Sequence, residues 1–403
     1  MSFLELFDMK VGTVGFCGGN KSGWGIRVQS LHCMLSTFSD VRLIYTEPEA
    51  TIDDELIAAM HGRIESRKIT APENNKTRMR RLLTNYRSDQ GTLDQETVKS
   101  AREGLDAIQV EALDLLFIGR ELAQEKLPLI LDEHNIYWEL NQYSIYDSPL
   151  FQTRIGQMRA LRAVIGPWLR SRGTAFELSA MRRANHVLFT SERDANLARD
   201  RIPQIRDRST VIPNCIDANR YGLTTPRQEG ALPQVLFVGR LDYTPNHDAV
   251  EKICQALAPP FIGKAEFIIA GGPIPKIERI PSNVSFLGRV EDVRPLMVDA
   301  TVCIVPLRFG SGTRIKILEY MASSRPIVST SKGCEGLDVR NEEDIIVADT
   351  DEGFVSAIGR LLEDESLARS LGQNANRLVR KKYDWRVHSN KLKAAYESVG
   401  LKP

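Results

Sequence analysis

The chain has 403 residues, of which 42% are hydrophobic and 26% are charged, a balance typical of a soluble globular protein. Its length exceeds that of one ordinary hydrophobic core and predicts two domains. The net charge of +1 gives no global field that would favour a nucleic acid as partner. The six cysteines lack metal-ligand spacing, and the first residues lack the features of a signal peptide. No segment approaches about 18 uncharged apolar residues, so we expect a cytoplasmic protein with reduced thiols.

The first half alternates short apolar runs with helical patterns. The predicted helix covers residues 26–35, and the predicted strands cover residues 11–16, 41–45, 113–118, 127–131 and 186–189. This alternation predicts a parallel sheet covered by helices. Ligands of such sheets bind beyond the carboxyl ends of the strands.

A glycine-rich loop, Gly15–Gly25, follows the first predicted strand and contains Gly18, Gly19 and Gly23. Such a loop lets a ligand approach the backbone closely. A dehydrogenase is the alternative, because Gly23 and Gly25 partly match a dinucleotide-binding pattern. That pattern needs its tight turn directly after the strand and a third glycine, where this chain has Val28, so the alternative is disfavoured.

His134 follows the predicted strand that ends at Leu131, next to two acids and an asparagine. A lone histidine is often a satisfied structural residue. Its place at the carboxyl end of a strand makes a functional role an equal alternative.

Two stretches, residues 61–87 and 154–183, are rich in lysine and arginine. They are either solvated helix faces or surfaces for an anionic membrane or a lipid-linked acceptor. The second reading would place a cytoplasmic protein at the inner face of the membrane.

The second half restarts the alternation after a polar linker over residues 218–234. Its predicted strands cover residues 235–238, 265–270, 284–287, 302–305, 327–328 and 345–347. Predicted helices cover residues 248–257, 314–323, 351–362 and 385–399.

The stretch Val302–Thr330 combines a buried strand, a glycine turn and a helix start. Free N–H groups and the helix dipole make such a place suitable for an anion. Lys316 adds a charge in the first turn, and Glu319 adds a carboxylate one turn later. This pair suits a nucleotide sugar, with the phosphates at one end and a sugar diol beside them. The alternative without a ligand is a solvated ion pair between Lys316 and Glu319, worth about 0.2–0.5 kcal/mol.

Several segments in one order resemble the donor domain of family-four retaining glycosyltransferases. They are FVGRLDYTPNHDAV (237–250), FIIAGGPIP (267–275), NVSFLGRVEDV (283–293), PLRFGSGTRIKILEYMA (306–322) and PIVSTSKGCEGL (326–337). VIPNCID (211–217) resembles the hinge of that family, and YDW (383–385) resembles its last turn before the closing helix. The resemblance is specific from about residue 184 onward, whereas over residues 1–183 only the glycine loop and His134 correspond.

The resemblance implies the GT-B fold, an α/β architecture with two facing Rossmann-like domains and parallel sheets. The acceptor-side domain would cover residues 1–213, and the donor domain would cover residues 214–384. Residues 385–403 would form a helix that returns to the first domain.

The resemblance also implies roles for single residues. Glu319 would bind the ribose hydroxyls, and His134 would face the donor sugar. Arg240, after Gly239, would bind the diphosphate. The backbone of Arg289 and Val290 would meet the base, and the turn at the donor sugar and phosphates comprises Gly310, Ser311, Gly312 and Thr313.

Two departures from the family pattern bear on the site. The first of two paired glutamates falls on Ser311, and the lysine that usually follows the diphosphate arginine is absent from LDYTPN (241–246). Lys316, or else Arg314, must then supply that charge.

The sequence therefore predicts a retaining hexosyltransferase that uses a UDP-, GDP- or ADP-sugar in a cleft between two domains, with His134, Arg240 and Lys316 as its catalytic set. The acceptor is a glycan, a glycolipid or a small molecule. No cofactor or metal is expected, because Asp349-Thr350-Asp351 indicates a helix cap rather than a metal site. The alternatives are a non-catalytic nucleotide-sugar-binding subunit of a glycan-assembly complex and, less favoured, a nucleotide-sugar epimerase.

Overall fold

The computed structural model divides the chain into two compact units, which we describe separately. The first comprises Met1–Asn20, Arg27–Pro213 and His388–Pro403, and the second comprises Lys21–Ile26 and Asn214–Val387. The residues described here are 8–15, 23–45, 60, 63–69, 93–136, 138, 171, 173–222, 232–310 and 314–402.

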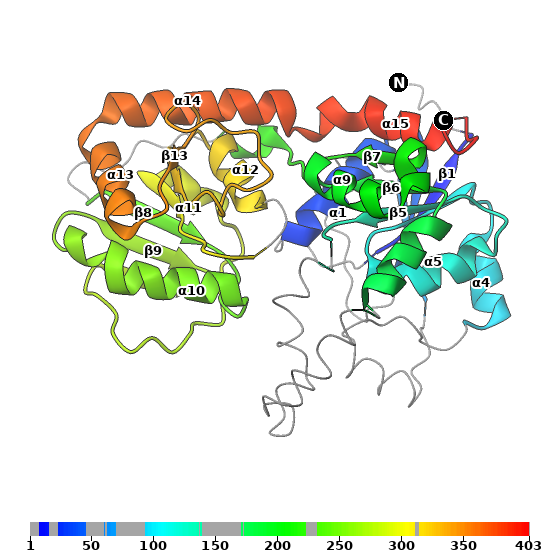
Figure 1. The fold of residues 1–403 in the computed structure, drawn as a ribbon, viewed down its shortest axis with the longest axis horizontal. Helices are drawn as coiled ribbons and strands as arrows, with labels where there is room; N and C mark the ends of the chain where they lie inside the picture. Colours follow the sequence, from blue (N-terminus) through cyan, green and yellow to red (C-terminus); the bar gives the residue numbers. More distant parts are fainter. Residues whose placement is uncertain are drawn as a thin grey trace. The chain divides into compact units, whose positions relative to one another are not determined.

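A parallel sheet forms the centre of the first unit (Figure 1). Its strand order is β3-β2-β1-β4-β5-β6-β7. The strands are β1 (Lys10–Val14), β2 (Asp40–Tyr45), β3 (Ile64–Lys68), β4 (Ala107–Val110), β5 (Leu129–Glu133), β6 (His186–Phe189) and β7 (Ser209–Val211). Every residue of β4, β5 and β6 is buried, whereas β3 lies at the edge and is largely exposed. This pattern follows from helices that cover both faces of a parallel sheet.

Helices and single turns accompany these strands. They are α1 (Gly23–Leu35), α4 (Gln95–Arg102), η1 (Leu113–Leu115), α5 (Leu116–Ala123), α9 (Glu192–Arg201), η3 (Pro203–Arg208) and α15 (Ser389–Glu397), which comes from the end of the chain. Ser191 caps α9, because its side chain accepts a hydrogen bond from the Asp194 N–H at 3.1 Å.

The predicted strand over residues 113–118 is wrong. These residues form η1 and the start of α5, and the strand is β4, immediately upstream. Short apolar runs fit a buried strand and a buried helix equally well. Gly119 allows α5 to lie close to β4, since an added Cβ would stand 2.2 Å from a methyl group of Val110.

The last helix packs on the first unit, which confirms the predicted return of the chain. The Tyr396 hydroxyl donates to Gln109 Oε1 at 2.7 Å, and the Tyr396 ring lies edge-on to Phe38 at 5.6 Å. Ser398 Oγ lies 3.0 Å from His186 Nδ1. A buried hydroxyl that finds an acceptor avoids the cost of an unpaired polar group.

The second unit is built on a parallel sheet of order β10-β9-β8-β11-β12-β13. Its strands are β8 (Gln234–Val238), β9 (Glu266–Ala270), β10 (Val284–Gly288), β11 (Val302–Val305), β12 (Ile327–Ser329) and β13 (Ile346–Val347). In chain order this is the doubly wound Rossmann arrangement 3-2-1-4-5-6. The predicted strands of this half are confirmed with boundaries that differ by at most one residue.

The second unit also contains helices that the strands position. They are η4 (Ala218–Tyr221), α10 (Thr244–Lys252), the π-helical η5 (Ile253–Leu257), η6 (Pro259–Phe261), α11 (Arg294–Asp299), α12 (Ile315–Ala322), α13 (Asp351–Glu363), α14 (Glu365–Lys382) and η7 (Trp385–His388). The sequence analysis missed α4, α11 and the 18-residue α14. The predicted cap is confirmed: Thr350 accepts from the Gly353 N–H, and Asp349 accepts from the Ser331 N–H at 2.8 Å.

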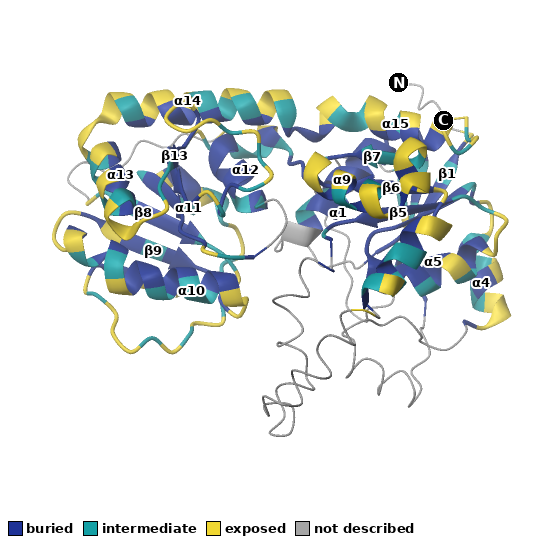
Figure 2. Ribbon diagram, in the orientation of Figure 1, coloured by how far each residue is buried: buried dark blue, intermediate teal, exposed yellow. Residues whose placement is uncertain are grey.

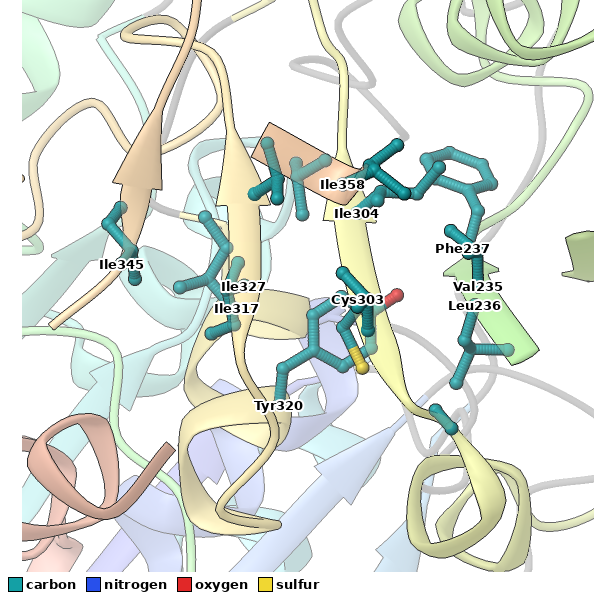
Figure 3. Close-up of a cluster of buried hydrophobic side chains, with 14 of the residues drawn as sticks. Val235, Leu236, Phe237, Cys303, Ile304, Ile317, Tyr320, Ile327, Ile345 and Ile358 are labelled. Carbon is teal, nitrogen blue, oxygen red and sulfur yellow. The ribbon is translucent and has the colours of Figure 1, made fainter. Parts of the chain in front are cut away.

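The core of the second unit lies between its sheet and its helices. Figure 2 shows the strands buried and the outer faces of the helices exposed. Tyr320, Phe237, Cys303 and Ile304 pack in this core (Figure 3). The Tyr320 hydroxyl accepts a hydrogen bond from the Val238 N–H at 2.9 Å, so α12 is joined to β8 by a polar contact inside an apolar cluster.

The basic stretches are only partly described. β3 lies in the first stretch, and residues 70–87 of that stretch fall outside the described residues. Residues 173–183 of the second stretch are helical. None of the helices in the described ranges combines the length and apolar character that crossing a bilayer requires.

Two helical glycines of the second unit give a test of its packing. An alanine Cβ at Gly372 in α14 would stand 2.2 Å from the Ser324 carbonyl oxygen, whereas one at Gly359 in α13 meets nothing within 4 Å. Gly359→Ala should raise the free energy of unfolding by about 0.5–1 kcal/mol. Gly372→Ala should lower it by about 1–3 kcal/mol because α14 must move away from the turn after α12 that contains Ser324. Urea unfolding of both variants measures the difference, and equal effects would contradict this packing of α14.

Candidate functional site

The second unit has its topological switch point between β8 and β11, the two central strands of its sheet. In open parallel sheets with this strand order, ligands bind beyond the carboxyl ends of the strands at the switch point. Gly239 follows β8, and residues 306–314 follow β11 and lead into α12. The predicted anion site of the sequence analysis therefore lies where the topology places a ligand.

Close backbone contact shapes the end of β8. Gly271 has φ +141°, and a Cβ there would stand 1.7 Å from the Gly239 carbonyl oxygen. A Cβ at Gly239 would stand 2.8 Å from both Lys316 Nζ and Asn246 Nδ2. Only glycine fits at these two positions without displacing neighbouring atoms.

Lys316 lies in the first turn of α12 and points at this backbone. Its ammonium donates to Asn246 Oδ1 at 2.9 Å and lies 4.3 Å from the centre of the Phe237 ring. Burial lowers the pKa of Lys316 to about 7, and the positive charge of Arg314 adds to this, while Glu319 opposes it. An anion at the ammonium would restore the charged form.

Glu319 lies one turn further along α12 and is 8% exposed. Its Oε1 accepts a hydrogen bond from the Tyr221 hydroxyl at 2.9 Å. Burial raises the pKa of Glu319 to about 7, and the Tyr221 hydrogen bond and the Lys316 charge act in the opposite direction. The predicted cation and carboxylate therefore lie together, both held in a desolvated place.

Arg240 is exposed and pairs with a neighbouring acid. Its Nη2 lies 2.8 Å from Asp242 Oδ2, and its Nε donates to Asp242 Oδ1 at 3.1 Å. The hydrogen bonds to Asp242 raise the pKa of Arg240. Its carbonyl oxygen accepts from Asn246 Nδ2 at 2.8 Å, which connects this loop to α10.

Arg314 precedes α12 and approaches the glycine turn. Gly310 has φ +114°, and a Cβ there would stand 2.6 Å from Arg314 Nη2. Burial lowers the pKa of Arg314, against the influence of Tyr243 and Glu335. The predicted turn residues Ser311, Gly312 and Thr313 lie outside the described residues.

The predicted base-binding segment follows β10. Arg289 is exposed, and its N atom lies 3.4 Å from the place of a Cβ on Gly272, which follows β9. Val290 is half-buried. Gly272 stands at the carboxyl end of β9, which pairs with β8, and Arg289 and Val290 stand at the carboxyl end of β10, one strand further, on the same edge of the sheet as Gly239.

In the first unit, His134 follows β5 and is 8% exposed. Its Nε2 lies 2.5 Å from Asp132 Oδ2. Burial alone would raise the pKa of Asp132, but the charges of Arg27 and His134 hold it below its ordinary value. Of the predicted glycine loop, Gly18 and Gly19 lie outside the described residues, and Gly23 begins α1.

Arg27 of α1 is buried and lies against Asp132. It pairs with both oxygens of Asp132 and donates through Nη1 to the Ile212 carbonyl oxygen at 2.9 Å. This bidentate arrangement fixes the Asp132 carboxylate, and through it the place of His134. The sequence analysis missed Arg27 and its pairing with Asp132, because no motif connects residues about a hundred positions apart.

One group of side chains has the donor types that could hold a metal ion. Single ligand atoms of Glu111, Asp132 and His134 lie within 4.8 Å of one another. Arg27 already supplies a positive charge to Asp132, and His32 Nε2 lies 3.6 Å from Glu111 Oε1. The arrangement is therefore better suited to buried pairing than to a divalent cation.

Two further residues of the site escaped the sequence analysis. Tyr221, which reaches Glu319, lies in the segment predicted to be a linker, and Asn246 lies where the family lysine was sought. The polar and turn-rich composition of residues 218–234 concealed the first. The Pro-Asn pair at the start of α10 was the available signal for the second.

Comparison with known proteins identifies the second unit. Residues 232–364 match the family model described as Glycosyl transferases group 1. A relative from Campylobacter jejuni, an α-1,4-N-acetyl-D-galactosaminyltransferase acting on a GalNAc-containing PP-undecaprenol, is 30% identical over 149 residues. That match covers 35% of this chain and 42% of the relative, so the chain spans less than half of the relative's length.

Solved structures resemble the chain over nearly its whole length. Sucrose-phosphate synthase from Thermosynechococcus elongatus has a TM-score of 0.69 at 18% identity, covering 97% of this chain and 99% of that one. HepE from Anabaena, solved in complex with UDP and glucose, has a TM-score of 0.66 at 16% identity, covering 97% and 100%. The chain therefore has the GT-B fold, and its residues 232–364 match the model of the Glycosyl transferases group 1 family.

Proposed function

We propose that this protein is a retaining glycosyltransferase that takes its sugar from a nucleoside-diphosphate sugar. The observation that carries the proposal is the placement of Lys316 and Glu319 one turn apart on α12, at the switch point of a doubly wound sheet. A desolvated cation suits a diphosphate, and a desolvated carboxylate suits the ribose diol beside it. The complex of HepE with UDP and glucose supports this kind of donor.

The chemistry follows from where charge develops. When the nucleoside diphosphate leaves, negative charge builds on its outer phosphate. Lys316 and Arg240 stabilise that charge, and the low polarity around Lys316 strengthens its effect. The anomeric configuration of the sugar is retained if the acceptor hydroxyl attacks on the face from which the phosphate leaves and the leaving phosphate accepts the hydroxyl proton. His134 is proposed to contact the donor sugar.

The acceptor is proposed to be a glycan, and a lipid-linked one is favoured over a free one. The Campylobacter relative acts on a glycan that is linked to PP-undecaprenol, which supports this class. A lipid-linked acceptor would bring the protein to the inner face of the membrane. The two basic stretches, residues 61–87 and 154–183, are the proposed contacts with anionic lipid.

Steady-state kinetics of single variants test the roles of the site residues. The ribose is unchanged during the reaction, so Glu319→Gln should raise the donor KM and leave kcat nearly constant. The diphosphate gains charge, so Lys316→Ala and Arg240→Ala should each lower kcat about a hundred- to a thousandfold at saturating donor. A lower kcat in Glu319→Gln together with a normal kcat in Lys316→Ala would reverse the assignments of the ribose and diphosphate contacts. Tight donor binding without turnover would instead favour a non-catalytic subunit.

The pH dependence of kcat/KM should be bell-shaped around neutrality. Glu319, with a pKa of about 7, binds the ribose less well as the pH falls, and Lys316, also at about 7, loses its charge as the pH rises. Glu319→Gln should remove the acidic limb. It should also move the basic limb to lower pH, because Lys316 loses a negative neighbour. An acidic limb that persists in this variant would assign it to another group.

Transfer is proposed to be independent of a metal ion. Lys316, Arg240 and Arg314 already supply positive charge for a diphosphate, and Asp349 is engaged with Ser331. Activity should therefore survive EDTA with little change. A loss in EDTA that magnesium or manganese restores would contradict this and direct attention to Glu111, Asp132 and His134.

Vesicle co-sedimentation tests the membrane proposal. Each lysine or arginine near an anionic surface contributes about 1 kcal/mol, and salt screens this attraction. We expect binding to vesicles that contain anionic lipid at low salt, release at high salt, and no binding to neutral vesicles. No binding at low salt would leave both basic stretches as solvated surfaces.

A further inference from the structure

Asn246 is a buried amide with a partner at each end. Its Oδ1 accepts from Lys316 Nζ at 2.9 Å, and its Nδ2 donates to the Arg240 carbonyl oxygen at 2.8 Å. The side chain is 7% exposed and lies in the first turn of α10. It occupies the end of the segment LDYTPN (241–246), which lacks the lysine that the family pattern leads one to expect.

We propose that Asn246 is a positioning residue for the transfer reaction, which holds the ammonium of Lys316 against the end of β8 so that it can meet the donor diphosphate. This inference rests on the proposed function of the site. It explains how a charge that is missing from the loop after β8 is supplied from α12 instead. The segment after β8 does not carry the cation itself, but its Asn246 provides the acceptor that holds the Lys316 ammonium there.

The Asn246 amide satisfies both partners at once. An ammonium needs an acceptor, and the Arg240 carbonyl needs a donor. Because each end of the Asn246 amide serves one of them, its orientation is determined. A carboxylate would place an oxygen against the Arg240 carbonyl, and an aliphatic side chain would leave both groups without their bonds.

The ammonium is confined on its other sides. The Phe237 ring lies 4.3 Å away, and Gly239 has no side chain to displace it. One ammonium hydrogen is used by Asn246, which leaves two for phosphate oxygens. The charged groups that face Lys316 are Arg314 before α12 and Glu319 on α12, while α10 and β8 contribute Asn246 and Phe237.

Two substitutions at this position should change Lys316 in opposite directions. Asn246→Leu removes an acceptor of the ammonium and should move the basic limb of kcat/KM to lower pH. Asn246→Asp adds a negative charge beside it and should move that limb to higher pH, by about one pH unit. Both should lower kcat about ten- to a hundredfold, because the cation is displaced or already neutralised. A substitution that acts only through stability would not give shifts of opposite sign.

Gln255 provides the matched control, since it is an exposed amide in η5, directly after α10. Gln255→Leu and Gln255→Asp should leave both kcat and the basic limb unchanged. Basic limbs that stay in place in both Asn246 variants, or move in the same direction, would overturn the proposal.

An NMR titration of Lys316 in the ligand-free protein makes the test independent of activity, and Asn246→Asp serves if Asn246→Leu fails to fold. The pKa of Lys316 should rise in Asn246→Asp and fall in Asn246→Leu. If the pKa of Lys316 shifts in this way but the protein shows no transfer activity, the contact between Asn246 and Lys316 is confirmed and the proposed function is wrong. If the protein transfers sugar but the pKa of Lys316 does not shift, the proposed function stands and only the role of Asn246 is overturned.

Discussion

The site depends on a desolvated ammonium. Lys316 is held over an aromatic ring and against an amide, with Arg314 nearby and the Glu319 carboxylate one turn away. Removing a cation from water is costly unless an anion or strong acceptors compensate. Burial accordingly lowers the pKa of Lys316 to about 7. A diphosphate would supply the compensating negative charge, so the same desolvation that makes the charged form of Lys316 costly favours the binding of an anion.

Glycine backbone makes this arrangement geometrically feasible. Gly239 and Gly271 bring the ends of β8 and β9 into contact and leave space for Lys316 Nζ beside the chain. The Tyr320 hydroxyl, which accepts from the Val238 N–H, fixes α12 to β8 just below that point. The placement of the cation is therefore a property of the core as well as of the loops. The first unit follows a related principle, since Arg27 and Asp132 compensate each other where β5 ends at His134.

Sequence patterns predicted the second unit well because its strands are apolar runs closed by glycine or proline. Val302–Val305 is the clearest example. Patterns failed where the apolar run was ambiguous, as in residues 113–118, and where a strand was short and partly polar, as in β4. They also missed α14, whose polar outer face and lack of a strand partner weakened its signal.

The residues of the site likewise divide into those that the sequence pattern predicts and those that it does not. Lys316 and Glu319 could be predicted because they share one helix and a fixed spacing. Tyr221 and Asn246 could not, because their contacts with α12 join positions about a hundred and about seventy residues apart. Such contacts depend on how the sheet brings segments together, which local periodicity does not encode.

Thermal stabilisation by nucleotide sugars tests the central claim most directly. A ligand at 100 times its Kd stabilises the protein by about 2.7 kcal/mol. Among UDP-, GDP- and ADP-sugars, at least one should raise the melting temperature of the wild-type protein, and the double variant Lys316→Ala with Glu319→Gln should lose that response. An equal response in the double variant, or none from any nucleotide sugar in the wild type, would contradict the assignment of this site.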